Sequence, residues 1–190
     1  MDPEDQIETC PRDLLEQAMR QAGDDDAAGL AALESLLDRY PRDPGLHFLR
    51  GSILASLRRC EDAQAAMERA VEMAPGFALA RFQLGFVQFT SGDAEAAQTA
   101  WAPLLTAPED DPLRLFVEGL EALARDDFDT AVARLTEGVS RNLQNEPLNQ
   151  NMRLLLQKLA ETRAGGDTEG EPVSSAHLLL QQSATRRTMH

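Results

Sequence analysis

The side chains best suited to metal binding or nucleophilic catalysis are few in this sequence and far apart. They are three histidines and two cysteines: His47, His177, His190, Cys10 and Cys60. No two of them have the short spacing of a zinc motif, and neither cysteine has a histidine near it in sequence. His47 falls in a predicted helix, where we expect it to be structural. The sequence therefore predicts no catalytic residue, no metal site and no cofactor, and we expect the protein not to be an enzyme.

Two acidic runs and one glycine pair are the remaining candidates for ligand chemistry. Asp24–Asp26 and Glu109–Asp111 could attract a cation, but neither fits the pattern of a calcium-binding loop. Acidic residues at such places are typical helix caps and solvated turns, and we interpret both runs in that way. Gly165 and Gly166 belong to no phosphate-binding motif, and we interpret them as part of a linker.

The composition restricts the partners and the compartment. The 190 residues include 32 acidic and 18 basic side chains, and the formal net charge is -14. This charge disfavours nucleic acid and anionic membranes, which attract clustered Lys and Arg, and it favours basic or amphipathic protein partners. The N-terminus lacks the apolar run of a signal peptide, no stretch reaches the length of a membrane span, and the cysteines form no disulfide framework. We therefore expect a cytoplasmic protein.

The strongest pattern in the sequence is a regular repeat of small residues. It is carried by three glycines and three alanines: Gly51, Gly85, Gly119, Ala63, Ala97 and Ala131. Within each set the neighbours differ by 34 in residue number, and each glycine precedes its alanine by 12. A fixed period of this length predicts a stacked array of helical repeats.

Apolar residues at helical spacing between glycine and proline breakers predict a pair of helices in each period. The array is expected at 10–145, with four repeats at 10–43, 44–77, 78–111 and 112–145. A ninth helix, at 146–163, carries Leu148, Met152, Leu155 and Leu159 on one face and is expected to cover the last repeat. We expect residues 1–9 to be disordered and residues 164–190 to form a flexible tail with a short helix at 173–182.

This pattern resembles the tetratricopeptide repeat family. That family's repeat unit has the same period, with a small residue at position 8, Ala at 20, a large apolar residue at 24, a small one at 27 and Pro at 32. The second repeat matches at Gly51, Ala63, Met67, Ala70 and Pro75. The third matches at Gly85, Ala97 and Trp101, and the fourth at Gly119, Ala131 and Leu135. The resemblance implies an all-α, right-handed α-solenoid of four helix-turn-helix units with a C-terminal capping helix.

One proline departs from the family pattern. Pro103 falls inside the expected second helix of the third repeat. Proline lacks the amide hydrogen that a helix needs and clashes with the preceding turn. We therefore expect that helix to kink or end early, with an irregular segment at 101–111.

A second apolar stripe follows the first helix of each repeat, at unit positions 2, 5, 9 and 12. In tetratricopeptide arrays such positions line a concave groove that receives ligands. The resemblance therefore implies a peptide-binding groove with these candidates: Phe48, Ser52, Leu79, Phe82, Phe86, Phe89, Phe116 and Leu120. The alternative is that these residues are ordinary core or lie under the ninth helix.

An apolar groove with an acidic rim suits an amphipathic segment that bears Lys or Arg. The stripe lacks the Lys, Arg and Asn set with which some family members hold a C-terminal carboxylate, so we exclude that mode. We expect a protein-interaction module, an adaptor, scaffold or chaperone, which is similar in size and acidity to tetratricopeptide chaperones of bacterial secretion systems. The alternative is a self-associating assembly factor, a homodimer with the stripe at its interface. A third hypothesis places the tail at 173–182 in its own groove or a neighbour's.

Overall fold

The computed structural model describes residues 9–164, and this part of the chain contains nine α-helices, one 3₁₀ helix and no strand. The first four helices are α1 (Arg12–Asp24), α2 (Asp26–Arg39), α3 (Pro44–Ser56) and α4 (Cys60–Met73). They are followed by α5 (Ala78–Thr90), α6 (Ala94–Trp101), the 3₁₀ helix η2 (Ala102–Thr106), α7 (Pro112–Ala124), α8 (Phe128–Arg141) and α9 (Glu146–Ala164). The expected all-α solenoid of helix hairpins is confirmed. The repeat boundaries stay a prediction, and the helix expected at 173–182 lies outside the described residues.

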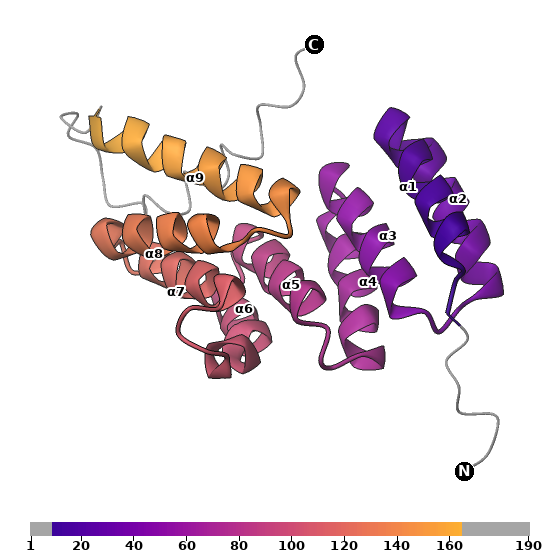
Figure 1. Ribbon diagram of the computed structural model, residues 1–190, viewed down its shortest axis with the longest axis horizontal. Helices are drawn as coiled ribbons and strands as arrows, with labels where there is room; N and C mark the ends of the chain where they lie inside the picture. The colour runs from indigo at the N-terminus through magenta and orange to yellow at the C-terminus, as the bar shows by residue number, and fades with distance from the viewer. Residues whose placement is uncertain (1–8, 165–190) are drawn as a thin grey trace. The chain divides into compact units, whose positions relative to one another are not determined.

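The chain forms two compact parts, the N-terminal half (Met1–Val87) and the C-terminal half (Gln88–His190). In the N-terminal half α1 packs on α2, α2 on α3 and α3 on α4, which Figure 1 shows as neighbouring indigo and purple helices. The buried residues Ala18, Leu33, Leu36 and Leu46 form a core cluster of this half.

The period of the sequence recurs in the backbone of the turns between paired helices. Among the described residues, only Arg58, Gly92 and Asp126 have a positive φ, of 65°, 94° and 56°. They are separated by the same interval as the repeated glycines, and at each one the following amide donates to a carbonyl five residues earlier. This is the Schellman arrangement, which satisfies carbonyl groups at a helix end. Glycine adopts this conformation without strain, whereas arginine and aspartate are held in it by the turn.

Aspartate is the N-cap residue of five of the nine described α-helices. Asp25, Asp43, Asp93, Asp111 and Asp127 each accept a hydrogen bond from an amide in the first turn of α2, α3, α6, α7 or α8. Such caps satisfy amides that have no partner within the helix, and a negative charge is favourable there. The interpretation of the two acidic runs as sites of helix caps is confirmed at Asp25 and Asp111.

Helix α6 ends early, as the position of Pro103 predicts. The α-helix ends at Trp101, and Ala102–Thr106 continues as a 3₁₀ helix. The segment beyond it is attached to the next hairpin, because Arg114 donates to the carbonyl oxygen of Ala107 at 2.7 Å and Arg141 pairs with Asp110 at 3.6 Å.

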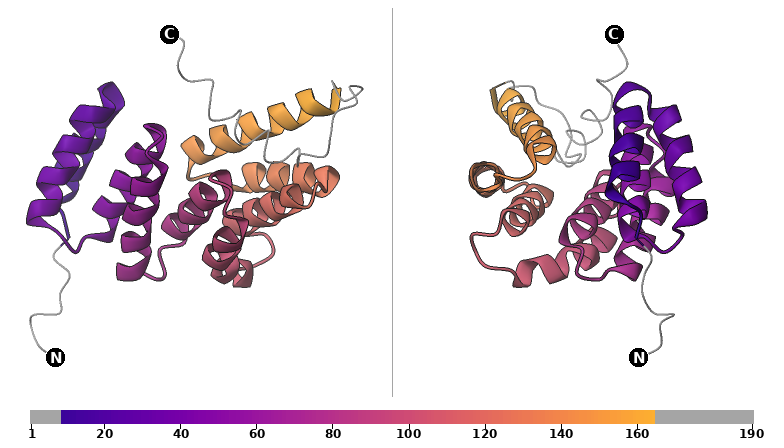
Figure 2. Two further views of the ribbon diagram at one scale, coloured as in Figure 1. Left: turned by 180° about the vertical axis from the view of Figure 1, so that it is seen from behind. Right: turned by 45° about the vertical axis from the view of Figure 1, so that its right-hand side comes forward.

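The C-terminal half is built on α7, α8 and α9. Helix α9 packs on α8, and the left view of Figure 2 shows the two side by side in orange to yellow. At one end of this pair Arg163 contacts Asp129 at 2.8 Å, and at the other end Asn142 and Asn149 are joined by two hydrogen bonds of 2.9 and 2.7 Å. The apolar face of α9 is buried, as expected for a capping helix: Leu148, Met152, Leu155 and Leu159.

Candidate protein-interaction surface

The eight candidate groove residues lie on α3, α5 and α7 and differ in burial. Four of them are half-buried: Phe48, Ser52, Leu79 and Phe86. The other four are buried: Phe82, Phe89, Phe116 and Leu120. All four half-buried residues belong to the N-terminal half, whereas the three candidates in the C-terminal half are all buried.

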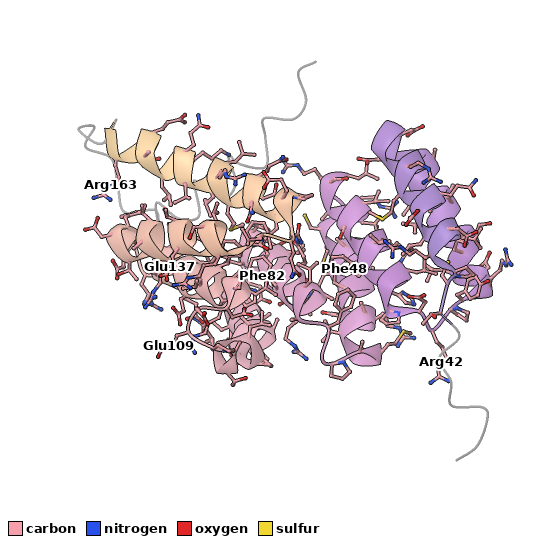
Figure 3. All side chains as sticks on the ribbon, viewed as in Figure 1. Arg42, Phe48, Phe82, Glu109, Glu137 and Arg163 are labelled. Atoms are coloured by element: carbon pink, nitrogen blue, oxygen red, sulfur yellow. The ribbon has the colours of Figure 1, made fainter. Side chains whose placement is uncertain are left out.

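In the N-terminal half the aromatic candidates form two ring pairs. Phe48 lies against Phe77, with ring centroids 5.1 Å apart and the planes tilted by 52°. Phe82 stacks on Phe86 at 6.2 Å. The Ser52 hydroxyl donates to the carbonyl oxygen of Phe48 at 3.0 Å, one turn earlier on α3. Phe48 and Phe82 are labelled in Figure 3 on α3 and α5. These pairs give the half-buried rings fixed positions.

In the C-terminal half the candidates serve internal packing. Phe116 lies directly over Gly138, where an added Cβ would be 2.6 Å from two ring atoms of the phenylalanine. Phe89 packs on Trp101 with ring centroids 5.6 Å apart. Phe116 and Leu120 have no exposed surface, so they offer nothing to a partner.

A pocket in the N-terminal half adds residues that the repeat register did not select. It has a volume of about 260 Å³ between α1, α2 and α3, and its walls are Met19, Asp26, Leu33, Leu49, Ser52, Ile53 and Ser56. The Ser56 hydroxyl donates to the Asp26 carboxylate at 2.9 Å. Of these residues the sequence pattern predicts only Ser52, because the pocket lies where three helices meet rather than along one stripe. Asp26 is the one charged residue among its walls.

Cys10 and His47 make structural contacts, Cys60 is an exposed free cysteine, and His177 and His190 lie outside the described residues. The Cys10 amide donates to the buried Asp43 carboxylate at 2.7 Å, and the same carboxylate caps α3. Burial raises the pKa of the Cys10 thiol, and the negative charge of Asp43 raises it further, so the reactive thiolate is disfavoured. His47 contacts the carbonyl oxygen of Pro41 at 2.9 Å through Nε2.

The described residues contain neither a metal-binding cluster nor a membrane-spanning helix. Within residues 9–164, no three His, Cys, Asp or Glu side chains are grouped so that they could hold a metal ion. No described helix is both long and apolar enough to cross a bilayer.

Comparison with known proteins agrees with the repeat architecture. Residues 48–103 match the family model described as tetratricopeptide repeat. The solved structure of MamA 41-end from Desulfovibrio magneticus RS-1 is similar with a TM-score of 0.56 and 14% identity, over 82% of this chain and 96% of that one. The MamA RS-1 ArsTM double mutant has the same TM-score and identity, over 91% of this chain and 93% of that one. No curated protein matches the sequence.

The likeness to MamA, at 14% identity, is a likeness of fold. The family match adds the repeat type, with its helix hairpins that present surfaces to other proteins. The match supports a broad role for this chain as a scaffold for protein–protein interaction. Residues 48–103 therefore have the pattern of the tetratricopeptide repeat, and the described part of the chain shares its fold with solved helical-repeat structures.

Proposed function

We propose that this protein binds an amphipathic segment of a partner protein on the half-buried apolar surface of its N-terminal half. We call this surface the α3–α5 surface, and it consists of Phe48, Ser52, Leu79 and Phe86. The observation that carries the proposal is the uneven burial of the stripe. Four of its five members in the N-terminal half keep accessible surface, Phe82 being the exception, whereas all three members in the C-terminal half are buried. Accessible rings held in place lose little entropy when a partner covers them.

The charge of the chain supports a basic partner segment. With a formal net charge of -14, the protein attracts Lys and Arg at long range, while the apolar side chains supply the contact. A chaperone that holds such a segment of a client is the narrower form of this proposal.

The test uses a labelled synthetic helical peptide with leucines on one face and lysines on the other, titrated with the full-length protein. We expect saturable binding in fluorescence anisotropy, and at least about tenfold weaker binding to Ser52→Lys, which adds a positive charge within the α3–α5 surface. Leu154→Lys on α9 is the matched control, because Leu154 is 57% exposed and far in sequence from this surface. The Leu154→Lys variant should bind the peptide with the same affinity as the unmodified protein. Equal affinity in a folded Ser52→Lys variant would contradict the proposal.

Self-association through the same surface is distinguished by sedimentation velocity over a concentration series. The proposal predicts a monomer whose mass is independent of concentration. A stable dimer that Ser52→Lys dissociates, with no peptide binding, would show that the surface is an oligomer interface instead.

A further inference from the structure

The pocket between α1, α2 and α3 is an apolar surface whose rim is open to solvent. Met19 is 51% exposed at this pocket, while Leu33 forms part of the same lining at 1% exposure. Leu49 and Ile53 are half-buried and contribute further apolar walls. An open apolar site of this kind loses unfavourable contact with water when an aliphatic side chain enters it.

The polar side of the pocket has a defined charge. The Asp26 carboxylate is the one charged group in the lining, and it accepts the Ser56 hydroxyl at 2.9 Å. It retains capacity for a further donor, because a carboxylate has about four acceptor positions. The complementary ligand therefore has aliphatic side chains together with a cation.

One stretch of this chain has that composition. Residues 173–190 contain three consecutive leucines, Leu178–Leu180, and two arginines, Arg186 and Arg187. All 32 acidic residues of the chain lie at or before Glu171, so this stretch has basic but no acidic side chains. It is the natural electrostatic complement of an otherwise acidic protein.

We propose that the C-terminal segment 173–190 docks in the α1–α2–α3 pocket of its own chain. Leucines of 178–180 supply the aliphatic contact with Leu33, Leu49 and Ile53, and the arginines supply the charge opposite Asp26. Because Ser52 belongs both to this pocket and to the α3–α5 surface, the docked segment would compete with a bound partner.

The test uses the full-length protein with a photo-crosslinking amino acid in place of Leu179. After illumination and digestion, mass spectrometry should find adducts on the peptides of α1 and α3 that contain Met19, Leu49 or Ile53. The crosslinked protein should run at the mass of one chain. Met19→Lys should reduce the yield at least about fivefold by adding a charge like that of the arginines. Leu154→Lys, at a residue of similar exposure, should leave the yield unchanged.

A second variant changes no described residue. Arg186→Glu combined with Arg187→Glu should also lower the yield at low salt, since it reverses the charge that faces Asp26. Adducts confined to other elements, adducts only at the mass of two chains, or a yield that Met19→Lys leaves unchanged in a folded protein would each overturn the proposal. The inference does not depend on the proposed function. Crosslinking without binding of the synthetic peptide, or the reverse, would show which of the two is wrong.

Discussion

The hairpins α3–α4 and α7–α8 have the same skeleton but expose different amounts of apolar surface. In each, a glycine of the first helix meets the large residue at unit position 24 of the second. An added Cβ would be 2.7 Å from Cγ of Met67 at Gly51, and 2.7 Å from Cγ of Leu135 at Gly119. The close approach of the helices is therefore common to both. The difference between the two hairpins must arise elsewhere.

The residue at unit position 27 accounts for part of this difference. The fourth repeat has Gly138 there, and Phe116 occupies the space that a Cβ would take. The second repeat has Ala70 at the same position, and its Phe48 is half-buried against Phe77 instead. The two phenylalanines thus differ in what they pack against: Phe116 lies over a glycine of its own hairpin, whereas Phe48 lies against Phe77 and keeps accessible surface.

The α7–α8 hairpin is also held by a continuous ladder of ion pairs. It runs through Arg114, Glu118, Arg134, Glu137, Arg141 and Asp110, with separations of 2.8 to 3.6 Å. Figure 3 labels Glu137 near the middle of this half. Isolated exposed pairs contribute little, but a network fixes the loop and both helices together. The comparison teaches that one repeat motif can keep accessible apolar surface or serve as internal support, depending on what packs on it.

The largest expected effect is that of Gly119→Leu. Its side chain would overlap the branched Leu135, which has little freedom to move, so we expect a loss of about 3 kcal/mol or more in the free energy of unfolding. Gly51→Leu should cost less, because the unbranched Met67 adapts more readily. Urea unfolding measured by fluorescence checks this, with Trp101 reporting the C-terminal half and Tyr40 the N-terminal half. Each is the single residue of its type. Equal midpoint shifts for the two variants would contradict this part of the comparison.

Gly138→Ala tests the role of position 27 directly. The new methyl group would lie 2.6 Å from the Phe116 ring, which is rigid, so we expect the protein to lose about 1–3 kcal/mol of stability. Helix propensity alone predicts the opposite, a gain of about 1 kcal/mol when alanine replaces glycine. A higher urea midpoint for Gly138→Ala would therefore show that the Phe116 ring does not depend on the absence of a side chain at residue 138.

Asn149→Ala should loosen the capping helix. Asn149 is 3% exposed, and its side chain bonds both the backbone carbonyl and the side-chain amide of Asn142, so its loss removes two hydrogen bonds from the half-buried Asn142. We expect a cost of about 1–3 kcal/mol and faster hydrogen exchange in α9. Gln157→Ala, which removes an exposed hydrogen bond within the same helix, is the control. Unchanged exchange at 146–164 in Asn149→Ala would show that the apolar face alone holds α9.

The smallest effect is expected at Glu121, half-buried on α7. Burial raises the pKa of its carboxyl. The positive charge of Arg125 lowers this pKa and the negative charge of Glu118 raises it, and the net shift is upward. A raised pKa means that the folded state binds the proton more tightly, so ionisation destabilises the fold above the folded pKa. Glu121→Gln should therefore stabilise the protein slightly at pH 7, and the gain should disappear as the pH falls below the unfolded pKa. Unfolding midpoints at several pH values test this. A gain in stability that persists at low pH would show that ionisation of Glu121 is not its cause.

Much of the fold could be predicted from the sequence because it rests on local chemistry. Glycine and alanine at fixed spacing allow helices to approach, aspartate caps helix ends, and Pro103 ends α6 wherever the rest of the chain lies. The candidate surface was predicted less well. Phe116 and Leu120 have the same positions in their repeat as Phe48 and Ser52, yet they are buried.

The sequence by itself determined the period, the register and the pairing of helices, since each follows from residues close together in the chain. Only the tertiary structure decided which members of the stripe keep accessible surface, and it placed Met19, Leu49 and Ile53 around one pocket. Burial depends on residues that come together from different helices, such as Gly138 beneath Phe116. The spacing of residues along one helix does not encode those contacts. For that reason a stripe of one pattern is core at Phe82, Phe89, Phe116 and Leu120 but keeps accessible surface at its other four members.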